Sequence, residues 1–496
     1  MKRRNFLALA AAGSQALFAA EGDIPLHPTD LKFPALDFEP PNPADYRHEL
    51  PGGAVGYLVE DHQLPLVSVS LIVRTGAYLV APEHTGLASM TGSQMRSGGT
   101  KSMSARDFDE ESAFLATRIS CGIGATSGRA AMSCLKQNLD VSLNMFFDML
   151  RHPGFDPERL EISRARRLQG MQRRNDEISS IAGREYSRLM RGDHFSARSS
   201  TQATIESITP DLMRELQQKY FHPASFYFAV SGDFDTKEMI DRLGEYLTAQ
   251  GWPAEKPEVP AVPAPTHKPT PGVYFVNKSG VNQSSVQIGQ LGIARKNPDH
   301  IAVGIMNDIL GGGGFVSRIM SRVRSDEGLA YSAGSSFSPG LYYPGTFTAS
   351  FQSKNPTCAE ASTIVLEEIA KMRETRPTDE ELATSRNYAV EVFPRYFAVA
   401  GQVAGTFAAD EYSGREKGYW EKYRDRVSAV SADDVQSVAQ KYLKPEELAI
   451  LAVGAEAEML AGNPDKPQYG FRKLAEDGKI NVIPLPDPMT MVYPEL

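Results

Sequence analysis

The chain has 496 residues, of which 41% are hydrophobic and 23% charged, and its formal net charge is −9. These proportions are typical of a globular protein with room for more than one domain. The negative balance, together with the lack of a concentrated Lys/Arg stripe with interleaved aromatics, argues against nucleic acid as a partner.

The first 20 residues have the pattern of a cleaved export signal. They combine a basic start, an apolar run from Phe6 to Ala12, and small residues up to Ala20. The run is too short to span a membrane, and no later stretch is long and apolar enough to do so. Arg3 and Arg4 in "RRNFL" resemble the twin-arginine signal, which exports folded proteins; the alternative is an ordinary secretory signal. The sequence predicts an exported protein, periplasmic or secreted, with no membrane span after signal removal.

The segment "LVSVSLIVR" is the first clear strand of the mature chain. Val67, Val69, Leu71 and Val73 alternate with smaller or polar residues, so they share one face of a half-buried strand. A helix is expected over "GLASMTGSQMRS", from residue 86 onward.

Cys121 and Cys134 lie on either side of "GATSGRA", which predicts a hairpin. If Ser127 and Gly128 form the turn, the two thiols face each other across the strands. In an oxidising compartment they could form a disulfide; otherwise they are two small buried hydrophobic residues.

The sequence contains an internal repeat that indicates two copies of one domain. Residues 252–272 are dense in proline and predict an extended, semi-rigid linker. On either side the same pattern recurs: Thr209 or Ser431 caps a helix that runs to Lys-Tyr, a proline ends it, and an apolar strand follows. We therefore predict α+β class, with two homologous domains at 40–250 and 273–462, each an antiparallel sheet backed by helices, and a C-terminal tail at 463–496.

The stretch from residue 309 to residue 337, "ILGGGGFVSRIMSRVRSDEGLAYSAGSSF", is the most specific in the chain. Its four glycines are expected to end one helix and leave a mobile loop (Gly311, Gly312, Gly313 and Gly314). Ser317 can cap a second helix, which Gly328 ends. This order places Arg324 in the last turn of the helix and Tyr331 just inside the next strand.

Arg324 and Tyr331 can therefore reach one surface. Together they offer several N–H donors and one O–H donor, which suits a peptide carbonyl whose oxygen gains negative charge. The alternative is that Arg324 satisfies the C-terminus of its helix and Tyr331 packs on its own sheet. A phosphate-binding loop is excluded because no Gly-Lys-Ser/Thr follows the glycines.

These motifs resemble the pitrilysin/insulinase superfamily of zinc metallopeptidases, which includes mitochondrial processing peptidase. The similarity runs from about Pro51 to about residue 460, and "SRVRSDEGLAYS" matches the Arg/Tyr pattern of the second domain. The first domain of that family carries His-x-x-Glu-His on a helix and a distal Glu, which together bind zinc and activate water. The resemblance implies the same two-domain fold here.

At the zinc positions the chain departs from the family. Ser89 and Ser93 stand at the two His positions, Gly92 at the Glu position, and Gln169 near the distal Glu. Catalytic zinc needs three His, Asp, Glu or Cys ligands, so no metal site and no cofactor is expected in this chain.

The family also contains heterodimers in which one subunit holds zinc and the other supplies Arg and Tyr. The resemblance thus implies an exported, zinc-less peptidase subunit that is inactive alone, with a zinc-bearing homologous partner and peptide substrates. Arg324 and Tyr331 would act in trans, and the glycines at 311–314 would contact substrate. The alternative is a non-enzymatic scaffold or peptide-binding protein of the same fold. A serine hydrolase is disfavoured because the chain has no Gly-x-Ser-x-Gly elbow.

Overall fold

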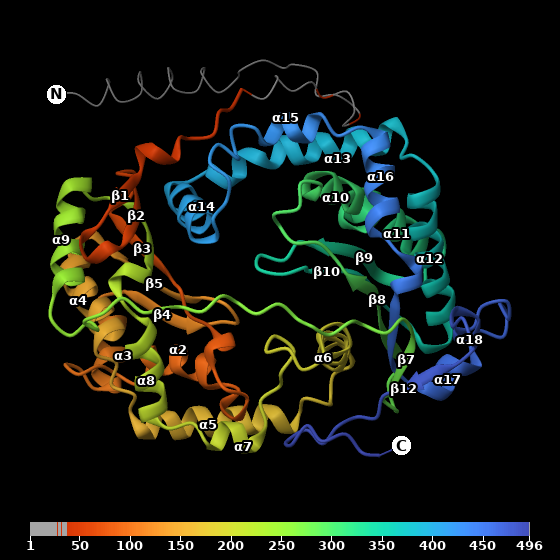
Figure 1. Ribbon diagram of the computed structural model, residues 1–496, viewed down its shortest axis with the longest axis horizontal. Coiled ribbons are helices and arrows are strands. Elements are labelled where there is room, and N and C mark those ends of the chain that lie inside the picture. Colours follow the sequence, from red (N-terminus) through yellow and green to blue (C-terminus); the bar gives the residue numbers. More distant parts are fainter. Residues whose placement is uncertain (1–26, 28–30, 32–36, 496) are drawn as a thin grey trace, which may run out of the picture. The chain divides into compact units, whose positions relative to one another are not determined.

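The computed structural model describes residues 27, 31 and 37–495. Its framework is two sheets with the same layout (Figure 1). The N-terminal sheet has the order β1-β2-β6-β3-β5-β4 and consists of β1 (Arg47–Glu49), β2 (Val55–Glu60), β3 (Leu66–Val73), β4 (Arg118–Ile123), β5 (Gly128–Leu135) and β6 (Phe226–Gly232). The C-terminal sheet has the order β12-β7-β11-β8-β10-β9 and consists of β7 (Gly272–Asn277), β8 (Gln283–Leu291), β9 (Ala330–Ser338), β10 (Thr346–Lys354), β11 (Ala449–Gly454) and β12 (Ile480–Val482).

The two-domain α+β fold predicted from the sequence is confirmed, although the sheets are mixed rather than purely antiparallel. Each sheet contains one parallel pair formed by strands from the start and the end of the domain. These pairs are β2 with β6 and β7 with β11. The other neighbours are antiparallel, apart from β12, which adds to β7 in parallel.

Helices cover both sheets. In the N-terminal domain these are α2 (Leu87–Ser97), α3 (Ala105–Phe114), α4 (Leu139–Arg151), α5 (Pro157–Gln172), α6 (Ile178–Arg191), α7 (Gln202–Glu206), α8 (Pro210–Tyr220) and α9 (Thr236–Thr248). In the C-terminal domain they are α10 (His300–Asn307), α11 (Arg318–Met320), α12 (Cys358–Glu374), α13 (Asp379–Val392), α14 (Ala400–Ser413), α15 (Tyr423–Ser428), α16 (Ala432–Tyr442), α17 (Glu456–Ala461) and α18 (Phe471–Leu474).

The internal repeat is confirmed at its most regular element. The Thr209 side chain caps α8 by accepting from the Leu212 N–H, and Ser431 caps α16 in a capping box with Asp434. Both helices end at the Tyr of Lys-Tyr, and each is followed by a proline turn and a buried strand. In β3, the four alternating residues from Val67 to Val73 are buried, as their spacing predicts.

Each domain gives one helix to the sheet of the other. Helix α6 belongs to the N-terminal half of the chain, yet its buried face packs on β7 and β11 of the C-terminal sheet. Helix α14 belongs to the C-terminal half and packs on β2 and β6 of the N-terminal sheet. The two helices occupy corresponding places in the repeat, so the exchange is reciprocal and ties the halves into one compact unit from Pro40 onward.

Polar contacts fix both exchanged helices. Glu411 on α14 accepts two hydrogen bonds from Arg47, each 2.9 Å long, and one of 2.7 Å from the Tyr57 hydroxyl. On α6, the Tyr186 hydroxyl donates to the Phe347 carbonyl at 3.2 Å and lies 3.0 Å from the Thr348 hydroxyl.

Of the two alternatives for Cys121 and Cys134, the structure has free thiols, and the turn on which the pairing depended does not form. Cys121 stands opposite Ala130 rather than Cys134, and the three cysteines are free thiols. The hairpin closes through a four-residue connection, Gly124 to Ser127, in which the Gly124 N–H donates to the Ser127 carbonyl. A two-residue turn at Ser127 and Gly128 would have placed Cys121 opposite Cys134, four residues further along β5 than Ala130.

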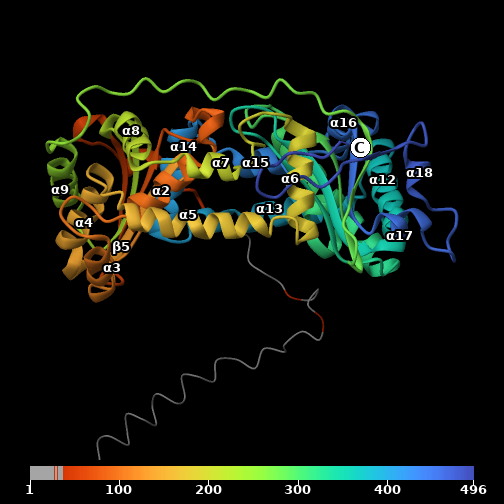
Figure 2. The same ribbon diagram turned by 90° about the horizontal axis from the view of Figure 1, so that it is seen from below.

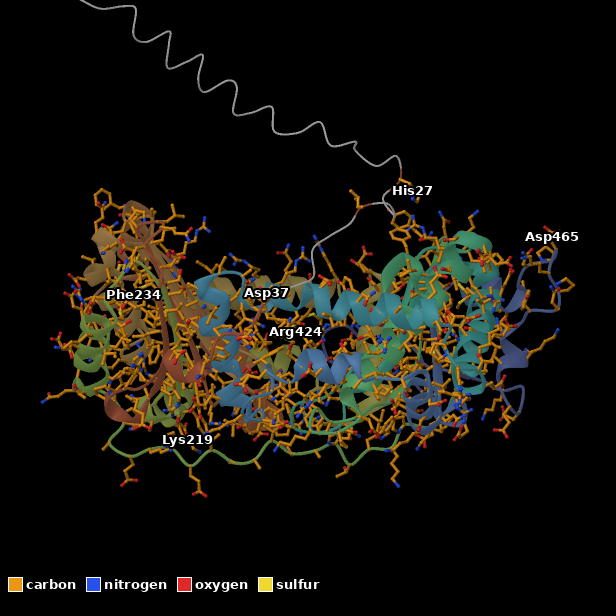
Figure 3. The ribbon with its side chains drawn as sticks, turned by 90° about the horizontal axis from the view of Figure 1, so that it is seen from above. His27, Asp37, Lys219, Phe234, Arg424 and Asp465 are labelled. Atoms are coloured by element: carbon orange, nitrogen blue, oxygen red, sulfur yellow. The ribbon has the colours of Figure 1, made fainter. Side chains whose placement is uncertain are left out.

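The linker and the tail lie against the domains. The linker is extended between residues 253 and 271 and runs along one side from α9 to β7 (Figure 2). The Tyr78 hydroxyl donates to the Pro260 carbonyl of the linker, and His194 Nε2 lies within hydrogen-bond distance of the Pro263 carbonyl. The tail contributes β12, and it buries Phe471 in the C-terminal core. Figure 3 labels two residues of the N-terminal domain, Phe234, which is buried, and Lys219, which is exposed.

The export signal predicted over residues 1–20 lies outside the described residues. Within the part of the chain that the structure describes, no helix combines the length and the apolar character needed to cross a bilayer.

Candidate functional site

Helix α2 carries the residues that stand at the zinc-site positions. Ser89 is exposed, Ser93 half-buried and Gly92 buried. The Ser89 hydroxyl donates to the Gly86 carbonyl and the Ser93 hydroxyl to the Met90 carbonyl, each at 3.0 Å. Both hydroxyls are therefore occupied within their own helix, and neither is a ligand type that zinc prefers.

Gly92 allows α2 to lie directly on the backbone of edge strand β4. A Cβ atom at this position would come within 2.4 Å of the Ile123 nitrogen and 2.7 Å of Gly122 backbone atoms. A glutamate side chain has no room between these two elements. The residues present do not fit a zinc centre. Ser89 and Ser93 are poor ligands, and the packing at Gly92 also excludes the glutamate that would activate water.

The position of the family's distal Glu also lacks a zinc ligand. Gln169 is exposed on α5. Among the described residues, no group of three or more His, Cys, Asp or Glu side chains is placed to hold a metal ion. The pocket beside Ser89 is instead lined by two arginines, Arg167 and Arg198, and burial lowers the pKa of the Arg167 guanidinium.

Arg324 and Tyr331 come together as their spacing predicts. The turn of helix that carries Arg324 is a π-helix from Ser321 to Asp326, and Gly328 then adopts φ 64°, which lets the chain reverse into β9. The Arg324 guanidinium carbon lies 4.7 Å from the centroid of the Tyr331 ring. Tyr331 is 84% exposed, so its hydroxyl is open to a partner molecule.

A third residue, Phe315, completes this cluster. The Arg324 guanidinium carbon lies 4.6 Å from the Phe315 ring centroid, so the cation is held between two aromatic rings. Phe315 and its neighbour Val316 are 66% and 69% exposed. We call Phe315, Arg324 and Tyr331 the Phe-Arg-Tyr cluster. No hydrogen bond or ion pair joins its guanidinium or hydroxyl to another residue that the structure describes.

The glycine run is less open than the sequence predicts. A π-helical turn continues α10 from Asp308 to Gly312, and Gly311 is buried against edge strand β9. A Cβ atom at Gly311 would lie 2.4 Å from the Ser335 nitrogen, whereas one at Gly314 would meet nothing within 4 Å. Gly311 to Gly313 therefore serve close packing, and Gly314, with φ 65°, begins the turn that presents Phe315.

The sequence analysis missed two features of these sites. Phe315 follows the last glycine directly, and its exposure became evident only from the structure. Arg167 lies in "SRARRLQGMQRR", where arginine recurs next to the lost distal position, but nothing there distinguishes it from its neighbours, and Arg198 lies outside this stretch.

Two sequence models of one peptidase family match the chain. Residues 57–196 match the insulinase model, peptidase family M16, and residues 207–388 match the peptidase M16 inactive domain. The first match covers α2 and β4, and the second covers the Phe-Arg-Tyr cluster.

Known proteins agree with this assignment. An uncharacterised zinc protease of Streptomyces coelicolor is 23% identical over 314 residues, which cover 62% of this chain and 68% of that protein. The non-peptidase homolog YmxG of Helicobacter pylori is 23% identical over 336 residues, 66% of this chain and 75% of that one. A solved peptidase M16 inactive domain from Pseudomonas fluorescens superposes with a TM-score of 0.74 at 21% identity, over 82% of this chain and 97% of that chain.

The two matching sequence models, the duplicated fold and the serine and glycine residues on α2 lead to one conclusion. The chain is an inactive member of the insulinase family, peptidase family M16, whose described residues do not form the zinc site of that family.

Proposed function

We propose that this protein is the non-zinc subunit of an exported heterodimeric metallopeptidase. In this proposal it supplies Arg324 and Tyr331 in trans to a zinc-bearing homologous partner, which cleaves peptides. The observation that carries the proposal is the contrast between the two domains. The zinc-site helix offers no ligands, while the Phe-Arg-Tyr cluster is exposed and its donors are unused within the described chain.

The roles follow from the donor chemistry. Arg324 would hold a carbonyl of the substrate backbone, because a guanidinium offers several fixed N–H donors. Tyr331 would donate its hydroxyl proton in a hydrogen bond to the oxyanion that forms when water attacks the scissile carbonyl. Phe315 would restrict the Arg324 side chain to one arrangement, so that less conformational entropy is lost when substrate binds. Residues 311–314 would contribute through Gly314, whose surroundings are open.

The water-activating step would belong to the partner. Zinc there would polarise the carbonyl and lower the pKa of its bound water. The family provides both kinds of chain, since one relative is named a zinc protease and another a non-peptidase homolog.

Purification of the natural complex tests the proposal. The chain is tagged at its C-terminus, recovered under native conditions from the periplasm or the medium, and its stoichiometric partner is identified. We expect a homologous chain with His-x-x-Glu-His, one zinc ion per heterodimer, and peptide hydrolysis by the pair but by neither chain alone.

A second candidate function is non-enzymatic, because a relative of this chain is named a non-peptidase homolog. In that case the fold serves as a scaffold or peptide-binding protein. Elution as a single species or a homodimer without zinc and without hydrolysis would support this function and contradict the first.

A further inference from the structure

The pocket beside Ser89 has a charge opposite to that of a zinc site. Its volume is about 320 Å³, and it lies between the start of α2, the end of β4, α5 and the loop after α6. No Asp or Glu is among the described residues that line it, although the chain as a whole carries a net charge of −9. Its polar lining consists of Thr85, Ser89, Arg167, Ser196, Arg198 and Ser200.

Arg167 is the unusual member of this set. It is half-buried on α5, and no hydrogen bond or ion pair connects it to another residue that the structure describes. Two other arginines on the same helix are paired, Arg159 with Asp109 and Arg164 with Glu161, and the adjacent Arg166 is exposed to solvent. A guanidinium keeps its charge in a protein, so a half-buried one without a counter-ion favours an anionic ligand.

Two further features add donors to the same pocket. Arg198 uses its Nε to donate to the Asp193 carbonyl and keeps its terminal N–H groups available. The first turn of α2 begins at Gly86, which provides no side-chain acceptor, so the positive end of the helix faces the pocket uncapped. These groups favour a carboxylate, which a planar guanidinium can bind through two parallel hydrogen bonds.

The rest of the lining is apolar and adjoins a strand end. Ala77, Val80, Ile123 and Phe195 form a wall suited to an aliphatic or aromatic side chain. Ile123 is the last residue of β4, and α2 covers its backbone at Gly92, so it contributes its side chain to this wall. A carboxylate and an apolar side chain occur next to each other at the C-terminus of a peptide that ends in an apolar residue.

We propose that this pocket binds the C-terminal carboxylate of a peptide. Arg167 and Arg198 hold the carboxylate, and the last side chain of the peptide rests on the apolar wall. The proposal uses no residue of the Phe-Arg-Tyr cluster, so it can fail or hold independently of the function proposed above.

Binding of two matched peptide pools to the intact mature chain tests this. Both pools are fluorescein-labelled hexapeptides with five randomised positions and a final leucine; one ends in a free carboxylate and the other in an amide. In fluorescence anisotropy we expect the free acids to bind about tenfold to a hundredfold more tightly, because a charge-assisted hydrogen bond is lost in the amide. Arg167→Gln should bring the free acids to the level of the amides.

The matched control is Arg166→Gln, an exposed neighbour on α5 that does not line the pocket. It should leave both affinities unchanged, and unchanged circular dichroism and melting temperature would show that both variants fold. Equal binding of the two pools, binding of neither at millimolar concentration, or an equal effect of both substitutions would overturn the proposal. If inorganic phosphate protects the wild type against heat, and Arg167→Gln removes the protection while the pools bind equally, the pocket holds a free anion instead of a peptide.

Discussion

The two homologous domains place a helix on their outer strand in the same way, yet they present different chemistry beside it. In the N-terminal domain α2 meets β4 at Gly92, and in the C-terminal domain the π-helical turn after α10 meets β9 at Gly311. In both, a Cβ atom would lie 2.4 Å from a backbone nitrogen of the edge strand. The surface next to the first contact carries Ser89 and Ser93, whereas the chain after the second leads to the exposed Phe-Arg-Tyr cluster.

This difference distinguishes the backbone contacts that stabilise the fold from the neighbouring side chains that could take part in chemistry. The backbone contact at each glycine fixes the helix against the sheet, so it is part of the fold. Ser89 and Ser93 are exposed or half-buried, so these positions can change without loss of packing, whereas Gly92, at the Glu position of the zinc site, is itself the packing contact. A zinc site can therefore disappear from one copy of the domain while the scaffold persists.

The largest predicted effect concerns the two glycines. Gly92→Ala and Gly311→Ala should each lower the free energy of unfolding by about 3 kcal/mol, because the new methyl group overlaps backbone atoms that cannot move aside. Urea denaturation of the three proteins measures the effect. The comparison between the domains fails if only one of the two substitutions destabilises.

A matched control is available on α5. Gly170 lies in that helix with nothing within 4 Å of an added Cβ. Gly170→Ala should raise stability by about 0.5–1 kcal/mol, since alanine restricts the unfolded chain and fits a helix. If Gly170→Ala destabilised as much as Gly92→Ala, close packing would not be the cause.

The second prediction concerns α14, the helix given to the N-terminal sheet. Burial alone would raise the pKa of the Glu411 carboxyl, but hydrogen bonds from Arg47 and Tyr57 outweigh it and hold the pKa below its ordinary value. Glu411→Gln should cost about 1.5–3 kcal/mol at neutral pH, the range for hydrogen bonds to a charged group.

The pH dependence of this effect has a definite sign. Because the pKa is lower in the folded state, the stabilisation is fully present above the unfolded pKa of about 4.3 and is lost as the pH falls through the folded value. Stability measured from pH 7 down to pH 3 should thus decline less steeply in Glu411→Gln than in the wild type. Parallel curves would contradict the assignment of this ion pair.

The smallest predicted effect concerns α6, the reciprocal helix. Tyr186→Phe removes one hydroxyl that contacts the Phe347 carbonyl and the Thr348 hydroxyl, and the ring stays in place. We expect a loss of about 1 kcal/mol in the free energy of unfolding. Since both exchanged helices hold the two domains together, this variant should still unfold in one transition. Separate unfolding of the two domains would show that the exchange does not couple them.

The sequence predicted the repeat, the α+β class and the meeting of Arg324 with Tyr331, because these depend on local signals. Caps at Thr209 and Ser431, prolines after Lys-Tyr and alternation in β3 each act within about ten residues. The contact of Arg324 with Tyr331 needs only a helix end, Gly328 and a strand start, which are also local.

The features that the sequence did not predict depend on distant parts of the chain. In this exchange α6 packs on β11 and α14 packs on β2, so each contact joins segments far apart in the sequence, and no short pattern encodes it. The hairpin register at Cys121 depends on whether the connection has two or four residues, and "GATSGRA" permits both. The positive pocket joins residues from α2, α5 and the loop after α6, so Arg167 could be placed only in three dimensions.

One substitution tests the central claim most directly: Tyr331→Phe in the purified complex with the proposed zinc-bearing partner. The ring and its contact with Arg324 are kept, and only the exposed hydroxyl is removed. We predict a fall in kcat of about 10²–10³-fold with unchanged zinc content and unchanged association of the subunits, because loss of one oxyanion donor has this effect. Tyr388→Phe, at another exposed tyrosine on α13, should change nothing. Equal turnover of wild type and Tyr331→Phe would contradict the claim that this chain completes its partner's active site.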